Sequence, residues 1–292
     1  MSDKDMDCPR VEYSPIIDRK PFKLPDNARV AVWVIVNVEK WDFNKPMPRT
    51  LAGAPGGANV FPDIPNYGWY DYGMRVGFWR IKEVLDKHQI KGTLSLNGAV
   101  CHTNPRMVEE CVKSDWEILA HSYVQRVLTE EDERDVIRLT VKTIRDFTGK
   151  APRGWMGPGI NETLNTPDVL TEEGIEYVAD WVNDDEPYPL KVKAGSLIAL
   201  PYTVELNDIP CHIIMHGDSS AFYDRARYEF DTFYKEGKTR AKIMTVTVHP
   251  YVTGVAHRCG FFEKLFEYIK QHDGAIFMRG FEILDWYKQF AK

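Results

Sequence analysis

Apolar residues along the chain gather in short continuous runs that alternate with segments of helical periodicity. Residues 29–39 contain the run "VAVWVIV", which is β-branched, nearly continuous and followed by polar residues only at its C-terminal end. Such a run is typical of a strand buried on both faces. Residues 74–88 then follow the period of a helix, with Val84 and Leu85 among its apolar positions. The first part of the chain therefore predicts a strand, a long loop and a helix.

The same alternation continues to the C-terminus. Further strands are expected in "GTLSLNG", "WEILAHS", "RGWMG", "EYVADW", "SLIALPY", "KIMTVTVHP" and "AIFMRG". Helices are expected in "NPRMVEECVK" with Asn104 as its cap, in residues 129–149 with Thr129 as cap and Gly149 as end, and in "TPDVLTEEG" with Thr166 as cap. Residues 219–236, residues 260–272 and the C-terminal segment complete the set.

About eight strands that alternate with helices predict one α/β domain over residues 29–292, with its parallel sheet closed as a β/α barrel. Residues 1–28 are expected to be an irregular leader. An open doubly wound sheet is the alternative, but no glycine fingerprint for a nucleotide follows the first strand.

Residues 40–72 form a long segment rich in glycine and proline, and loops of this length inside a compact domain are often functional. Among its aromatic residues are Phe61, Tyr67, Trp69, Tyr70 and Tyr72. These side chains suit either a lid over a substrate or a contact between subunits, and the sequence leaves both open.

Composition narrows the class of protein. Of the 292 residues, 43% are hydrophobic, which is enough for a sizeable core, and the net charge of −6 comes without a basic patch. Nucleic acid and anionic membrane surfaces are therefore not expected as partners. The five cysteines are scattered and form no CxxC pair, and the first residues are unlike a signal peptide, so we expect a cytoplasmic location.

Polar and aromatic residues stand at the C-terminal ends of the predicted strands, where a β/α barrel carries its active site. In chain order they are Asn37, Glu39, Asn97, His121, Trp155, Gly157, Asp180, Tyr202 and His249. A single histidine at a strand end is more often structural than catalytic. His121 and His249 gain weight because both are expected at the same end of the barrel. A carboxylate such as Glu39, at the end of a buried strand, must be paired, hydrated or bound to a metal.

Several of these segments together resemble the polysaccharide deacetylase (NodB-homology) superfamily, a family of distorted β/α barrels. The closest resemblance is to its allantoinase and cyclic imide hydrolase branch. The segments are "VNVE", "YGMRVGFWRI", "AHS", "APRGWMGPGIN", "ADWVNDDEPY", "PYTVELND" and "VTVHP", and the resemblance covers about residues 25–290. The resemblance also implies a homo-oligomer, often a tetramer.

The resemblance assigns roles to five positions. Sugar deacetylases of the superfamily use a base and a carboxylate ligand after the first strand, two histidine ligands, and a late histidine as general acid. The matching residues here are Asn37, Glu39, His121, Gln125 and His249. Asn37 cannot act as a base, because its amide nitrogen has no usable lone pair. Gln125 offers only a neutral oxygen, which is a weak ligand for zinc beside imidazole.

Because of these two departures, activation of the attacking water is expected to depend on Glu39. Glu39 would act either as a ligand of a metal that activates the water or, without a metal, as the base itself. A divalent metal held by Glu39, His121 and Gln125 stays open, with its absence slightly favoured, because the allantoinase branch is regarded as working without the usual metal. His249 is the expected acid. Backbone N–H groups near Gly157, or the Arg75 guanidinium, are candidates to stabilise the oxyanion.

The predicted function is hydrolysis of a non-peptide C–N bond in a small cyclic amide or imide, with catalytic Glu39, His121 and His249. The other polar residues at the strand ends, together with Arg75, are expected to bind the substrate. One alternative is a metal-dependent deacetylase of an N-acetylated substrate. The other is a member that binds a ligand or acts as a scaffold without catalysis.

Overall fold

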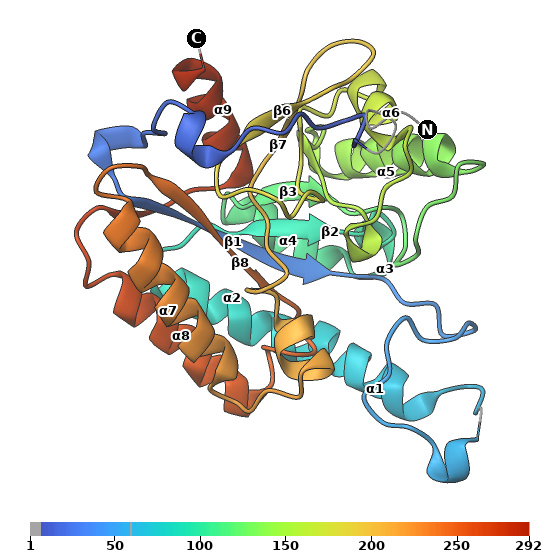
Figure 1. Ribbon diagram of the computed structural model, residues 1–292. Coiled ribbons are helices and arrows are strands. Elements are labelled where there is room, and N and C mark those ends of the chain that lie inside the picture. The colour runs from blue at the N-terminus through green and yellow to red at the C-terminus, as the bar shows by residue number, and fades with distance from the viewer. Residues whose placement is uncertain (1–6, 59, 292) are drawn as a thin grey trace.

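The computed structural model describes residues 7–58 and 60–291, and its centre is the long buried strand β1 (Figure 1). The strands run β6-β7-β5-β4-β3-β2-β1-β8, and β9 also pairs with β1. Their bounds are β1 Val30–Val38, β2 Thr93–Leu96, β3 Glu117–Ala120, β4 Gly154–Trp155, β5 Tyr177–Val178, β6 Tyr188–Leu190, β7 Leu197–Ala199, β8 Lys242–Val248 and β9 Ala275–Phe277.

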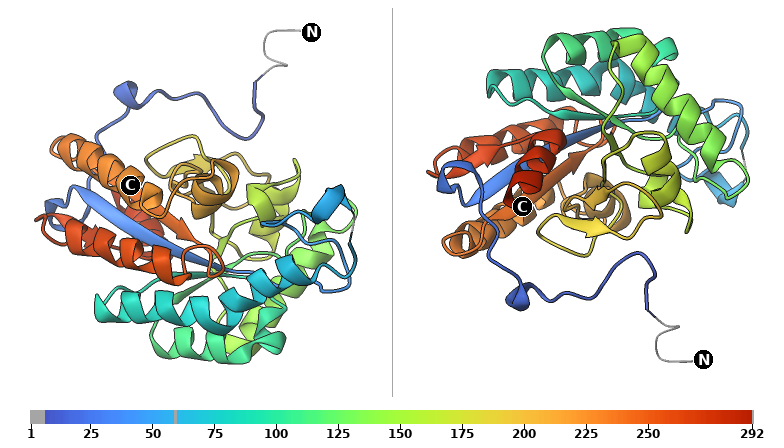
Figure 2. Two further views of the ribbon diagram at one scale, coloured as in Figure 1. Left: turned by 90° about the horizontal axis from the view of Figure 1, so that it is seen from below. Right: turned by 90° about the horizontal axis from the view of Figure 1, so that it is seen from above.

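Helices cover the outside of this curled sheet, with α2, α7 and α8 side by side against β1 and β8 (Figures 1 and 2). Their bounds are α1 Ile64–Tyr72, α2 Phe78–Lys87, α3 Val100–Thr103, α4 Pro105–Lys113, α5 Glu133–Thr148, α6 Thr166–Glu172, α7 Ala221–Glu236, α8 Ala256–Ile269 and α9 Gly280–Phe290. None of the helices in the described part of the chain is long and apolar enough to cross a membrane.

The sheet curls into a distorted barrel, as predicted, but its ladder does not close. On one edge β1 pairs with β8 over Val30–Val36. On its other edge it pairs with β9 near its N-terminal end and with β2 near its C-terminal end. On the far side of the barrel, the segment after β7 meets β8 through an isolated parallel bridge between Asn207 and Thr247. The short antiparallel strand β6 was not predicted, because its three residues, Tyr188–Leu190, are too few to show a periodic pattern.

Alternation along β1 separates two hydrophobic cores. Val32, Val34 and Val36 point to the helices, whereas Trp33 and Ile35 point into the barrel. The same alternation turns Asn37 and Glu39 inward at the C-terminal end of the strand. The polar groups of the barrel mouth therefore follow from a period of two along one strand.

A buried carboxylate closes the opposite end of the barrel. Glu117 accepts hydrogen bonds from the Tyr177 hydroxyl (2.7 Å), the Thr93 hydroxyl (2.9 Å) and the backbone N–H of Gly280 (2.7 Å) at the start of α9. Trp33 donates to the same Thr93 hydroxyl at 2.8 Å. Burial raises the pKa of Glu117 in spite of these donors. Because this end of the barrel is filled, an active site is expected at the C-terminal end.

The prediction of a loop over residues 40–72 is wrong for its last nine residues, which are helical. Helix α1 begins at Ile64 and continues through a π-helical turn, Gly73–Gly77, into α2. Asp63 caps it by accepting from the Asn66 backbone N–H at 3.2 Å, a cap hidden among the glycines and prolines that suggested a loop. The remaining loop and the start of α1 project away from the barrel (Figure 1).

Two of the three predicted helix caps are wrong. Asn104 is the N-cap residue of α4, as predicted, although its side chain makes no capping hydrogen bond. Asp132 stands before α5 in place of Thr129, and Asn165 stands before α6, so that Thr166 is the first helical residue. The predicted end of α5 is confirmed, because Gly149 adopts the left-handed conformation with φ 78°.

The continuous helix α1–α2 packs directly on the loop that follows β8. A Cβ atom on Gly77 would clash with the carbonyl oxygen of Pro250, and one on Gly73 would lie 2.5 Å from the backbone nitrogen of Tyr251. This close approach ties the position of His249 and its loop to the helix.

We expect Gly77→Ala to destabilise the protein by roughly 1–3 kcal/mol, because the Pro250 backbone has to move to admit the methyl group. Gly68→Ala in α1 is the control. Its Cβ would meet nothing within 4 Å, so the higher helix propensity of alanine should stabilise the protein by roughly 0.5–1 kcal/mol. Urea unfolding measures both changes, and equal stabilities for the two variants would contradict the packing described.

Candidate active site

Three side chains predicted to be catalytic meet at the C-terminal mouth of the barrel. Glu39 follows β1, His121 follows β3 and His249 follows β8, and they are only 3%, 3% and 4% exposed. The His249 Nε2 atom lies 3.5 Å from Glu39 Oε1. The site is therefore built around a buried pair of opposite charges.

The Glu39 carboxylate is held by an aromatic cage. Its Oε2 atom accepts hydrogen bonds from Trp41 Nε1 (2.7 Å) and from the Tyr251 hydroxyl (2.9 Å). The Trp41 ring stacks on Tyr70 with centroids 4.8 Å apart, and Tyr70 donates to the Glu39 backbone carbonyl at 2.9 Å. Burial alone raises the pKa of Glu39, but its hydrogen bond to His249 and the charge of that imidazolium outweigh burial and bring the pKa to about 2.

His249 is oriented from behind by Asp208. Its Nδ1 atom lies 2.6 Å from Asp208 Oδ1, and its backbone N–H donates to Oδ2 of the same carboxylate at 2.8 Å. Thr253 also donates to that oxygen at 2.6 Å. Burial lowers the pKa of His249, but the charges and hydrogen bonds of Asp208 and Glu39 raise it to about 9. The imidazole is thus a cation at neutral pH, with its Nε2–H aimed at the mouth.

His121 has the opposite character. Its Nδ1 atom lies 2.6 Å from the carbonyl oxygen of Met156, and because a carbonyl can only accept, Nδ1 carries the proton. Burial lowers the pKa of His121, against the charge of Glu39. A neutral ring with its proton on Nδ1 leaves a lone pair on Nε2. The mouth therefore contains one protonated and one neutral imidazole.

Two of the predicted amide residues lie in the same mouth. Asn97 uses its side chain within the protein, since Oδ1 accepts from the Lys40 backbone at 2.7 Å and Nδ2 donates to the His121 carbonyl. It holds together the ends of three strands, and so it is a positioning group. Asn37 is 2% exposed, and its Oδ1 atom has no hydrogen-bond partner in the protein.

Gly157, Asp180 and Tyr202 lie on the other side of His121. The Gly157 N–H donates to both oxygens of Asp180, at 2.7 and 3.0 Å, so it is not free to bind an oxyanion as predicted. The Tyr202 hydroxyl accepts from Asn207 Nδ2 at 2.8 Å, and burial raises the pKa of Tyr202 to about 12.

The structure does not bring two of the predicted substrate-binding residues into the mouth. Trp155 is fully buried in the core between sheet and helices, because the residue after an inward-facing Gly154 must point outward. The Arg75 side chain is 77% exposed on the outer surface and pairs with Asp71 at 2.9 Å. The sequence pattern places Trp155 at a strand end and Arg75 in a helix, but it cannot show the direction of either side chain.

The donors that the family resemblance assigns to a metal form a poor set. Gln125 has a buried Oε1 atom without a partner, but it brings no charge. Glu39 already has the His249 cation beside it and two donors on its other oxygen. One carboxylate, one imidazole and one amide oxygen do not fit a zinc ion well.

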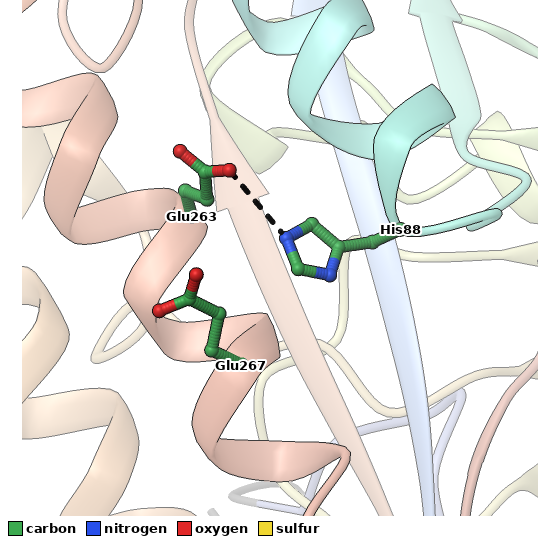
Figure 3. Close-up of side chains that lie close together, drawn as sticks. All are labelled: His88, Glu263 and Glu267. Atoms are coloured by element: carbon green, nitrogen blue, oxygen red, sulfur yellow. Dashed lines mark ion pairs between the residues drawn. The ribbon is translucent and has the colours of Figure 1, made fainter.

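Among the described residues, a cluster with metal-ligand spacing lies elsewhere, outside the barrel between α2 and α8 (Figure 3). It consists of His88, Glu263 and Glu267. Lys87 forms an ion pair with Glu263 at 2.5 Å, and His88 Nε2 lies 3.8 Å from the same carboxylate. These ion pairs account for the cluster as a link between two helices.

One cavity among the described residues also lies away from the mouth. It measures about 1040 Å³ and separates residues 11–19, which run along the outside of the barrel (Figure 2), from residues 182–191. Tyr202 reaches its lining, whereas Glu39, His121 and His249 do not. The buried charges, rather than this groove, define the candidate active site.

Sequence reasoning missed three residues of the site: Asp208, Trp41 and Tyr251. Asp208 stands in the segment "PYTVELND", but it does not directly follow a strand. A search limited to the C-terminal ends of predicted strands therefore does not find it. Trp41 and Tyr251 each lie two residues beyond a predicted site residue, Glu39 and His249. A search that extended two residues beyond each predicted site residue would have found Trp41 and Tyr251.

Comparison with known proteins agrees with this architecture. Residues 66–178 match the family model "Polysaccharide deacetylase". A putative polysaccharide deacetylase of Schizosaccharomyces pombe is 29% identical over 288 residues, covering 88% of this chain and 89% of the relative. The predicted resemblance to the polysaccharide deacetylase superfamily is thereby confirmed.

Two solved structures share the fold over nearly the whole chain. A probable polysaccharide deacetylase from Pseudomonas aeruginosa has a TM-score of 0.83 at 23% identity, covering 94% of this chain and 96% of that one. Puue allantoinase has a TM-score of 0.82 at 24% identity, covering 95% of this chain and 98% of that one. At these identities the likeness establishes the fold, which is the predicted distorted barrel.

The raised pKa of His249 predicts how stability and protonation depend on pH. Because its folded-state value of about 9 exceeds the ordinary 6.5, the stabilisation is complete below about pH 6.5 and is lost as the pH rises through about 9. We expect Asp208→Asn to lower the pKa of His249 and to move this loss to lower pH.

An NMR titration of the His249 ring measures the change directly. Asp218→Asn is the control, since Asp218 accepts hydrogen bonds from Ser220 in an exposed turn. An unchanged pKa of His249 in Asp208→Asn would contradict the role given to Asp208.

Proposed function

We propose that this protein hydrolyses a non-peptide C–N bond in a small cyclic amide or imide. The observation that carries the proposal is the pairing at the barrel mouth of a cationic His249, backed by Asp208, with a neutral His121. An acid and a base of these kinds are what amide hydrolysis needs, because water loses a proton and the leaving nitrogen gains one.

In the proposed reaction, His249 is the general acid. Its Nε2–H protonates the nitrogen as the C–N bond breaks, and the buried carboxylates of Asp208 and Glu39 keep the proton in place until then. Glu39 acts through His249 in this scheme. Its negative charge favours the imidazolium, and its caged Oε2 is already used.

We assign the general base to His121 in place of Glu39. A carboxylate with a pKa of about 2 attracts a proton only weakly at neutral pH. The Nε2 lone pair of His121 takes a proton from water, while the water oxygen forms the new bond to the carbonyl carbon. The products are a carboxylate and a free amide or amine on the opened ring.

Burial and unpaired oxygens support a small ring with N–H groups as the substrate. Asn37 Oδ1 and Gln125 Oε1 are buried acceptors without partners in the protein, and such atoms cost about 1–3 kcal/mol when left unpaired. The N–H of an imide or ureide can satisfy them. The likeness in fold to an allantoinase is consistent with such a ring.

We also propose that hydrolysis needs no resident metal, because the donor set around Glu39 fits one poorly. The positive charge that a metal would supply beside Glu39 is supplied by protonated His249.

The second candidate function is metal-dependent removal of an acetyl group from an N-acetylated substrate. The relatives named polysaccharide deacetylases favour it, and so does the unpartnered Gln125 oxygen, which is available to a cation. A homo-oligomer remains a further prediction. The loop before α1 and the start of α1 project from the barrel (Figure 1) and expose apolar side chains, among them Leu51, Phe61 and Ile64. These side chains are available for a contact between subunits.

Purified protein should open cyclic imides or allantoin in a turnover screen that also contains N-acetylated sugars. We expect His249→Gln to lower kcat by roughly 10²–10⁴, because it removes the acid. His102→Gln is the control, since His102 is exposed. Turnover of the N-acetylated sugars alone would refute the proposed substrate class.

Elemental analysis should find less than one equivalent of transition metal per chain, and dialysis against a chelator should leave turnover unchanged. Gln125→His provides the positive comparison. It adds a second imidazole four residues after His121, so we expect zinc to bind at least about tenfold more tightly than in the parent protein. Stoichiometric metal in the parent, with activity lost on chelation, would favour the deacetylase instead.

A further inference from the structure

A second buried carboxylate stands behind His121, one peptide unit away. The carbonyl oxygen of Met156 accepts the proton of His121 Nδ1, at 2.6 Å. The N–H at the other end of that peptide unit belongs to Gly157, and it donates to both oxygens of Asp180, at 2.7 and 3.0 Å. Asp180, the peptide and the imidazole thus form one continuous chain of hydrogen bonds.

The neighbouring backbone keeps this chain in register. Met156 N–H donates to the Ala120 carbonyl, and Ala179 N–H donates to the Trp155 carbonyl, so adjacent strands hold both ends of the chain. Gly157 is required at the contact. A Cβ atom there would lie 3.2 Å from Asp180 Oδ2 and would clash with the carbonyl of Asn161. The turn that follows is tight, with Gly159 at φ 64° and Ile160 at φ 53°, a strained value for a β-branched residue.

We propose that Asp180 is a positioning residue for His121 and acts through the Met156–Gly157 peptide. The inference rests on the proposed function, in which His121 is the base. A carboxylate on the N–H end of a peptide polarises the unit, so its carbonyl becomes a stronger acceptor for the imidazole proton. The arrangement is equivalent to the Asp208–His249 pair with a peptide inserted. It holds the ring and its tautomer but keeps the negative charge farther from the imidazole.

That separation explains why the two histidines differ. Asp208 touches His249 directly and keeps it a cation, whereas the peptide between Asp180 and His121 transmits orientation without a full ion pair. Asp180 itself forms no ion pair with a cation among the described residues, and its charged neighbour is Glu162. Burial and the charge of Glu162 raise the pKa of Asp180, and burial raises that of Glu162 to about 7. The two carboxyl groups together therefore retain a proton near neutral pH, and because both Asp180 oxygens accept from the Gly157 N–H, we assign this proton to Glu162 and the negative charge to Asp180.

The test uses the His121 Nδ1–H signal in ¹⁵N-histidine-labelled full-length protein, assigned with a His121→Gln variant. In the parent protein we expect a slowly exchanging proton on Nδ1 at the low field of a strong hydrogen bond. In Asp180→Asn we expect this signal to move upfield and exchange faster. With a substrate found in the screen above, kcat should fall roughly tenfold with little change in KM.

Matched variants separate positioning from general loss of structure. Asp184→Asn removes a carboxylate four residues along the chain that pairs with Arg19, and we expect no change in the His121 signal. Glu162→Gln keeps a neutral hydrogen-bonding partner beside Asp180, so the signal and kcat should stay close to those of the parent. Thermal melts establish whether each variant is folded.

An Asp180→Asn protein that is folded but keeps the parental His121 signal would overturn the proposal. If Asp180→Asn does not fold, the parent protein still decides, because a proton on Nε2 in place of Nδ1 would refute the arrangement. If the parent turns over none of the substrates, the proposed function fails, yet the His121 signal still tests the role of Asp180.

Discussion

The buried attraction between Glu39 and His249 is the interaction on which the rest of the candidate site depends. Two opposite charges 3.5 Å apart, each nearly inaccessible to water, are stable only when their remaining atoms are paired. Trp41 and Tyr251 pair the outer oxygen of Glu39, and Asp208 pairs the inner nitrogen of His249. Removing any of these partners leaves a polar atom of the buried pair without its hydrogen bond, which is why the aromatic cage and Asp208 are parts of the site rather than packing alone.

The fold supplies this arrangement through the direction of its strands. Parallel strands bring their C-terminal ends to one mouth, and the period of two along β1 turns Asn37 and Glu39 inward. At the other end of the barrel, Glu117 gathers Thr93, Tyr177 and the start of α9 into a polar plug. The helix α1–α2 packs against the loop after His249 at Gly73 and Gly77. The position of His249 is therefore fixed from outside the barrel as well as from within.

The two imidazoles of the mouth differ in protonation. His249 is kept charged by direct contact with carboxylates, whereas burial keeps His121 neutral and the Met156 carbonyl fixes its proton on Nδ1. In the proposed mechanism the same residue type serves as acid and as base because its surroundings differ. Asn37 and Gln125, which lack the charge of a base or a strong ligand, are consistent with this division of roles.

The sequence by itself predicted the order of the strands along the chain, a β/α barrel, and Glu39, His121 and His249 at the C-terminal ends of their strands. Each of these depends on a local period of hydrophobic residues and on the rule that parallel strands end on one side. Only the tertiary structure decided which way each side chain points and what it touches. Trp155 faces the helices, Gly157 gives its N–H to Asp180, Arg75 lies on the surface, and α1 begins inside the predicted loop. Asp208 was beyond local patterns for the same reason, since 41 residues separate it from the histidine that it orients. Such contacts join segments far apart in the chain, and the period of a single segment carries no information about them.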